Sequence, residues 1–112
     1  MLFRVPDDMD DQTAVLADPF AVSLHSVTRN PPPPGGRVLV WGAGALGSSV
    51  VAILRALYPD VEIGVVARFD SQVDLVQKLG ANKIFRPLEK AEMVEDLARW
   101  SGGVLKPTMK GL

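Results

Sequence analysis

The order of apolar and polar positions predicts alternating strands and helices over the last two thirds of the chain. Short apolar runs rich in β-branched residues predict strands; they span 37–41, 61–67 and 83–85. Apolar residues at three- and four-residue spacing predict helices; these cover 45–58, 70–79 and 89–100. Such alternation produces βαβ units with parallel strands and right-handed crossovers. We therefore expect an α/β fold with flanking helices and about three parallel strands.

Two further helices are predicted ahead of this pattern. The acidic residues before position 12 favour the start of a short helix over Asp10 to Ala17. Asp18 and Pro19 then have the residue types of an N-cap and a first helical position, which predicts a helix over 19–29. An apolar stripe at i, i+4 and i+7 supports this helix; it consists of Phe20, Leu24 and Val27.

A proline- and glycine-rich linker separates these helices from the α/β pattern. Asn30 and the prolines 31–34 end the preceding helix, and Gly35 and Gly36 complete the connector. Residues 1–36 are therefore predicted to be a helical segment with a linker, and residues 37–103 a strand–helix domain. The remainder, 104–112, has no clear period and is expected to be irregular.

The junction of the first strand and its helix carries a glycine motif of the form Gly-x-Gly-x-x-Gly, at 42–47. This motif between a buried strand and a helix is typical of a Rossmann-type dinucleotide site. The first glycine permits a tight turn, the second lets a pyrophosphate approach the backbone, and the third lets the helix lie close to the strand. The helix N-terminus then faces the anion. The predicted cofactor-binding residues here are Gly42, Gly44, Ala45, Leu46 and Gly47.

The end of the second strand bears on the choice of cofactor. An acidic residue about 20 positions beyond the glycines normally binds the ribose 2′-hydroxyl of NAD. Ala67 stands at this place and Arg68 follows it. A small residue and an arginine suit a 2′-phosphate, so we add both residues to the cofactor site and favour NADP over NAD. NAD stays open if the strand ends later, at Asp70, whose other interpretation is the N-cap of the helix 70–79.

Composition narrows the class of protein. The 112 residues are 47% hydrophobic and 22% charged, as in an ordinary soluble domain. A formal net charge of −1 predicts no general attraction to nucleic acid or to anionic membranes. The most apolar window, 43–54, is too short for a membrane span, and the N-terminus lacks a targeting segment. The absence of cysteine excludes disulfides and a cysteine nucleophile, and it is compatible with a cytoplasmic location.

Three stretches together resemble the medium-chain, zinc-type alcohol dehydrogenases, particularly their sorbitol- and threonine-dehydrogenase-like branch. They read P-D-D-M-D-D-Q-T-A-V-L-A-D-P-F-A-V-S-L-H-S-V, P-G-G-R-V-L-V-W-G-A-G-A-L-G and L-V-Q-K-L-G-A-N-K-I-F. Their order and spacing agree with the family from about Val5 to Gly103. This resemblance is more specific than the glycine motif taken alone.

The resemblance implies a catalytic zinc in the complete enzyme. Its last protein ligand in the family is often the glutamate of a Glu-Pro pair, and Asp18 stands at this place, 24 positions before Gly42. Asp18 is thus the one candidate metal ligand, but it is shorter than glutamate, and the family's upstream Cys and His-Glu ligands are absent. Because one carboxylate cannot hold zinc, we do not expect this chain to bind it. No catalytic residue is predicted; His25 has no local carboxylate or nucleophile.

The family's cofactor domain has six parallel strands, of which this sequence supplies about half. The resemblance therefore implies the NAD(P)-binding portion of an alcohol or polyol dehydrogenase, not catalytic on its own. A non-catalytic remnant or an association module that keeps the fold remains the alternative. The strand 37–41 is apolar on both faces, as a central strand should be, yet it would lie at an edge. Self-association through this strand is therefore predicted.

Overall fold

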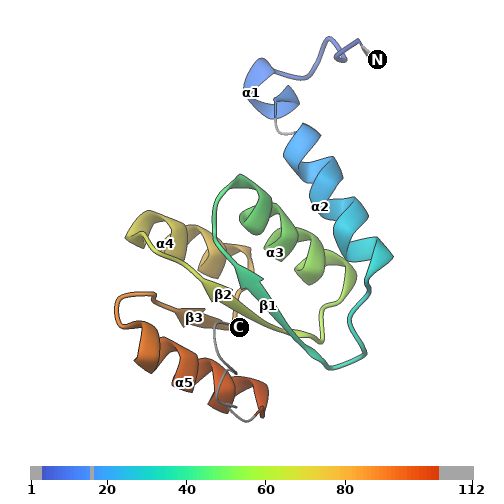
Figure 1. Ribbon diagram of the computed structural model, residues 1–112. Helices are drawn as coiled ribbons and strands as arrows, with labels where there is room; N and C mark the ends of the chain where they lie inside the picture. The colour runs from blue at the N-terminus through green and yellow to red at the C-terminus, as the bar shows by residue number, and fades with distance from the viewer. Residues whose placement is uncertain (1–3, 16, 104–112) are drawn as a thin grey trace, which may run out of the picture.

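The computed structural model describes residues 4–15 and 17–103, which form a three-stranded parallel sheet with helices on both faces (Figure 1). The elements in chain order are α1 (Asp11–Ala14), α2 (Ala17–Arg29), β1 (Arg37–Trp41), α3 (Ala45–Leu57), β2 (Glu62–Val66), α4 (Asp70–Leu79), β3 (Lys83–Phe85) and α5 (Lys90–Ser101). The strand order is β1-β2-β3, so the predicted α/β fold is confirmed. Within these residues, none of the helices has both the length and the apolar character needed to cross a membrane.

The central strand β2 builds a core on each face of the sheet. Ile63 and Val65 are fully buried in the larger core, where they meet apolar residues of α3 and α4. Val66 points to the opposite face and packs with Phe85 and Met93 in the smaller core beneath α5. Figure 1 shows the same division, with α3 and α4 on one side of the sheet and α5 on the other. Because both faces are covered, β2 is apolar along nearly its whole length.

The amino edge of the sheet is held together by Arg55, near the end of α3. Its guanidinium donates hydrogen bonds to the carbonyl oxygens of Val61 (3.0 Å) and Gly80 (2.8 Å) and to the side-chain oxygen of Asn82 (2.7 Å). The same Asn82 oxygen accepts the backbone N–H of Ile63 at 2.8 Å. One charged side chain thus ties α3 to the segments that enter β2 and β3, with charge-assisted bonds that are stronger than neutral ones.

The face of the sheet that carries the smaller core is tied to α5 through Trp100. Its indole N–H donates to Glu62 at 2.7 Å, and the Arg37 guanidinium lies 3.2 Å from the other carboxylate oxygen. The Trp100 hydrogen bond, and after it that from Arg37, holds the pKa of the Glu62 carboxyl below its usual range. A Cβ at Gly64 would lie 2.9 Å from the Trp100 ring and 3.0 Å from Phe85, so glycine makes room for both rings.

The two N-terminal helices begin differently. Asp10 is the N-cap of α1, where its carboxylate accepts the Thr13 N–H at 2.7 Å, a bond that lowers the pKa of the carboxyl. The prediction that Asp18 is the N-cap of the next helix is wrong, because α2 already begins at Ala17. Asp18 instead lies inside the first turn, where a carboxylate still interacts favourably with the positive end of the helix dipole.

The helix α2 packs on α3 through a narrower strip than its apolar stripe predicts. Val27 is buried, but Phe20 and Leu24 are exposed. Besides Val27, the buried residue of α2 is Ser23, whose hydroxyl donates to the Leu46 carbonyl oxygen at 3.1 Å. Among the described elements α2 has α3 as its main neighbour, and a single neighbour covers one narrow side of a helix.

Candidate functional site

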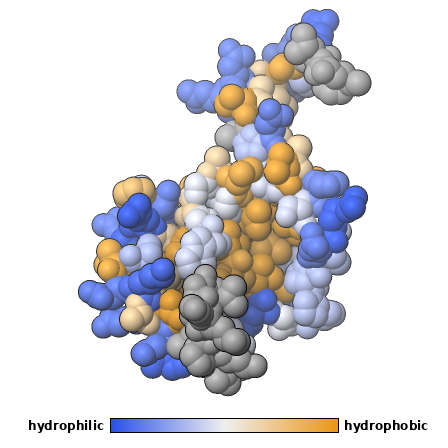
Figure 2. Space-filling view, in the orientation of Figure 1, coloured by the Kyte–Doolittle hydropathy of each residue, from blue (hydrophilic) through white to orange (hydrophobic). Residues whose placement is uncertain are grey.

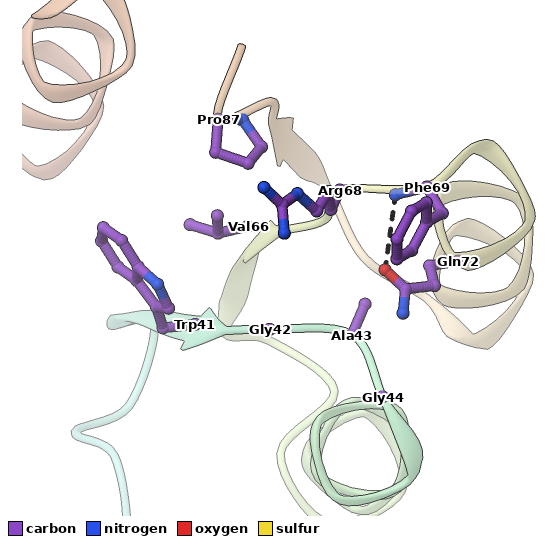
Figure 3. A pocket seen from close by; sticks show the side chains of 9 residues that line it. All are labelled: Trp41, Gly42, Ala43, Gly44, Val66, Arg68, Phe69, Gln72 and Pro87. Atoms are coloured by element: carbon purple, nitrogen blue, oxygen red, sulfur yellow. Dashed lines mark hydrogen bonds between the residues drawn. The ribbon is translucent and has the colours of Figure 1, made fainter. Parts of the chain in front are cut away.

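A pocket of about 380 Å³ opens at the carboxyl ends of the strands (Figure 3). Its lining residues are Trp41, Gly42, Ala43, Gly44, Val66, Arg68, Phe69, Gln72 and Pro87. They come from the ends of β1 and β2, the first turn of α4 and the segments that follow the three strands. In open parallel sheets, ligands bind at this edge because the loops after the strands converge there.

Two of the motif's glycines fix the turn from β1 into α3. Gly42 has a φ of +106°, a conformation that favours glycine, and its N–H donates to the Val66 carbonyl oxygen at 3.0 Å. A Cβ at Gly47 would collide with the Gly42 carbonyl oxygen and touch Val40 at 3.4 Å. The geometry therefore agrees with the turn predicted for Gly42 and the close helix–strand packing predicted for Gly47.

The second glycine, Gly44, forms the open wall of the pocket. It is the N-cap of α3, and no side chain among the described residues caps that helix. A Cβ at Gly44 would meet nothing within 4 Å, so the backbone is open to a ligand. The N–H groups of Ala45, Leu46 and Gly47 precede the first donor of the helical ladder, the Ser48 N–H, which binds the Gly44 carbonyl at 2.9 Å. Three N–H groups at a helix N-terminus can bind an anion.

The structure separates the two residues predicted at the end of β2. Ala67 is fully buried in the core under α3 and α4, and its N–H donates to the Phe85 carbonyl oxygen at 3.0 Å. Arg68 is exposed, and its side chain points into the pocket, between Pro87 and the turn at Gly42 (Figure 3). Of this pair, Arg68 lines the pocket and Ala67 lies behind it.

Asp70 is the first residue of α4 rather than its N-cap, which corrects the second interpretation of this carboxylate. The N-cap is Phe69, whose N–H points toward the Gln72 side-chain oxygen at 3.4 Å. The Asp70 carboxylate pairs with Arg86 at 3.0 Å. Arg86 also donates to the Arg68 carbonyl oxygen at 3.0 Å, so it contacts both the β2–α4 loop and the start of α4.

Sequence reasoning missed several residues at this edge of the sheet. Phe69, Gln72 and Pro87 line the pocket, and Arg86 lies beside it. Arg86 and Pro87 directly follow β3, and Phe69 lies in the loop that follows β2. Because carboxyl ends of parallel strands meet at one edge, their position after predicted strands is the signal that could have identified them.

The described residues do not supply a zinc site. Asp18 is exposed in the first turn of α2. Over residues 4–15 and 17–103, no group of three or more His, Cys, Asp or Glu side chains is placed to hold a metal ion. A catalytic zinc takes three protein ligands and an open position, so the residues present do not fit the metal.

A glycine turn that opens a helix at the carboxyl edge of a parallel sheet defines the class of Rossmann-type dinucleotide-binding folds.

No family model matches the chain. A probable D-xylulose reductase A from Arthroderma otae is 32% identical over 101 residues, which are 90% of this chain and 28% of that protein. The homologues of the chain are zinc-type alcohol and polyol dehydrogenases, the family that its sequence resembles. It spans about a quarter of the length of the curated relatives it matches.

Solved structures show the same architecture. The alcohol dehydrogenase rspB from Escherichia coli CFT073, complexed with NADH, has a TM-score of 0.72 and 25% identity, over 95% of this chain and 30% of its own. The quinone oxidoreductase from Thermus thermophilus, solved also with NADPH, has a TM-score of 0.70 and 27% identity, over 91% and 33%. The predicted resemblance to zinc-type alcohol dehydrogenases and the Rossmann-type fold are thus confirmed.

Proposed function

We propose that the chain binds a nicotinamide adenine dinucleotide, as the cofactor-binding part of an alcohol or polyol oxidoreductase. The observation that carries this proposal is the pocket wall at Gly44, where an open backbone position adjoins the free N–H groups of α3. A pyrophosphate bound there would accept hydrogen bonds from the first turn of the helix. We assign this role to residues 37–103, preceded by the helical segment and linker of 1–36; the predicted tail 104–112 lies outside the described residues. We also propose a cytoplasmic location.

We propose further that the pocket prefers NADP. The pocket lining contains no carboxylate among the described residues, and it contains the cationic Arg68. Ala67, at the place of the NAD-selecting acid, is buried and presents no acceptor to a ribose hydroxyl. Phe69 and Pro87 offer apolar surfaces that suit an adenine ring. The two solved relatives hold NADH in one case and NADPH in the other, so the preference rests on this chain's own residues.

Bound nicotinamide would supply the hydride chemistry, and the chain's residues would position it. Gly42 and Gly47 hold the turn, the first turn of α3 would bind the pyrophosphate, and Arg68 would bind the 2′-phosphate of the ribose. We assign no step to zinc, because Asp18 has no partner ligands among the residues described.

Fluorescence titration tests the proposal directly. Trp41 lines the pocket and is 66% exposed, so its emission should change when a cofactor binds. We expect NADPH to saturate the signal at a concentration several-fold lower than NADH, because Arg68 gains a charge-assisted bond to the 2′-phosphate. No change with either cofactor at about 1 mM, which corresponds to a binding energy of only about 4 kcal/mol, would contradict dinucleotide binding.

We propose self-association through β1 as a second property of the chain. Within the part that the structure describes, no strand pairs with the outer edge of β1. Leu39 and Trp41 are exposed there, and Figure 2 shows hydrophobic side chains gathered on the face that carries this strand. Unpaired edge groups beside apolar side chains favour pairing with another chain.

Light scattering measures the outcome. We expect dimers or larger species that increase with protein concentration, and a lower fraction of them in Leu39→Lys, since a charged edge residue opposes strand pairing. A monodisperse monomer at high concentration would rule out association through this edge.

A further inference from the structure

Arg86 stands at the place where two loops of the pocket meet. It follows β3 directly, and its two terminal nitrogens contact the β2–α4 loop and the first residue of α4. One lies 3.0 Å from the Asp70 carboxylate and the other donates to the Arg68 carbonyl oxygen at 3.0 Å. The sequence neighbours of this pair, Phe69 and Pro87, both line the pocket. The ion pair therefore adjoins the part of the pocket that Arg68 enters.

The pairing matters because Asp70, at the start of α4, is the acidic residue through which recognition of NAD stays open. An unpaired carboxylate two residues after Arg68 could accept a hydrogen bond from a ribose 2′-hydroxyl and would repel a 2′-phosphate. In the structure Arg86 offsets the charge of Asp70 and occupies one of its oxygens. The Asp70 side chain is 93% exposed, so water screens the pair and its effect is moderate.

We infer that Arg86 is a positioning residue that sets the preference for a 2′-phosphorylated dinucleotide, by pairing with Asp70 and offsetting the charge of its carboxylate. This inference rests on the proposed dinucleotide site and names a determinant of its specificity. Arg86 does not need to touch the cofactor. It acts through the charge of Asp70.

The test compares the dissociation constants of NADPH and NADH for four forms of the full chain, by the emission of Trp41. These are the unaltered chain, Arg86→Met, Asp70→Asn and the double variant. In Arg86→Met the preference for NADPH should fall about fivefold to tenfold, since the freed carboxylate disfavours the phosphate. Asp70→Asn should keep the preference. The double variant should return to within about twofold of the unaltered ratio, because the carboxylate is gone.

Two further variants separate charge from packing. Arg99→Met removes the same charge in the last turn of α5 and should leave the ratio unchanged. Arg86→Gln keeps an N–H donor for the Arg68 carbonyl but no charge, and it replaces Arg86→Met if circular dichroism shows that the methionine variant does not fold.

The outcomes separate this inference from the proposed function. Equal weakening of both cofactors by Arg86→Met and Arg86→Gln, or a double variant that is no better than the single one, would overturn the role of Arg86. An unaltered chain that prefers NADH, yet shifts further toward NADH in Arg86→Met, would overturn the proposed NADP preference and support the role of Arg86. Binding of neither cofactor to the unaltered chain would overturn both.

Discussion

Replacing Gly44 with valine is expected to abolish dinucleotide binding while the fold remains intact. A Cβ at this position meets nothing within 4 Å, and the backbone there, with φ −76° and ψ −160°, is one that valine adopts. The side chain would instead fill the space through which a pyrophosphate reaches the N–H groups of α3. Titration with NADPH should show affinity reduced by about a hundredfold or more, as a loss of close to 3 kcal/mol implies. The thermal midpoint should change little.

Ala56→Val is the matched control for this substitution. Ala56 is exposed near the far end of the same helix, so it tests the added valine away from the pocket. Its affinity for NADPH should equal that of the unaltered chain. Unchanged binding by Gly44→Val would show that the phosphates do not lie over Gly44.

Replacing Gly47 with alanine is expected to destabilise the fold by about 3 kcal/mol, the upper part of the usual cost of overpacking. The new methyl group would collide with the Gly42 carbonyl oxygen, which is backbone and has little freedom to move. Gly42 is fixed by its hydrogen bond to Val66, and its positive φ leaves few alternatives. Urea unfolding followed by circular dichroism should show a lower midpoint with a similar slope.

Gly44→Ala provides the comparison, since it adds the same methyl group three residues earlier, in open space. It should leave the free energy of unfolding within about 1 kcal/mol of the unaltered chain, as for substitutions that create no clash. If Gly47→Ala were equally mild, the close approach of α3 to the turn would not be a packing requirement.

The sequence predicted the regular elements well, because their signals are local. The strand 37–41 and the helix 70–79 agree with β1 and α4 at both ends. Gly80 has the left-handed conformation expected of a residue that ends a helix. The turn at Gly42 and the close packing at Gly47 also follow from local geometry, since neither position suits a Cβ.

The side chains around the pocket were harder to predict. Ala67 and Arg68 are adjacent in sequence, yet only Arg68 reaches the pocket; the alternation that puts Ile63 and Val65 in the core also puts Ala67 there. Arg86 is 18 positions beyond Arg68, and its two contacts arise only when β3 aligns beside β2. No local pattern marks such a pair. The position of each residue after a parallel strand is the one general clue.

The Arg55 hydrogen bonds lie at the amino edge of the sheet, whereas the pocket lies at the carboxyl edge. The hydrogen bonds that hold the sheet together thus lie at the opposite edge from the residues that line the pocket. Loop residues such as Arg68, Phe69 and Pro87 can drift or be exchanged over evolutionary time at little cost to the scaffold. Substitutions around this pocket should therefore change its ligand preference with little effect on the stability of the sheet.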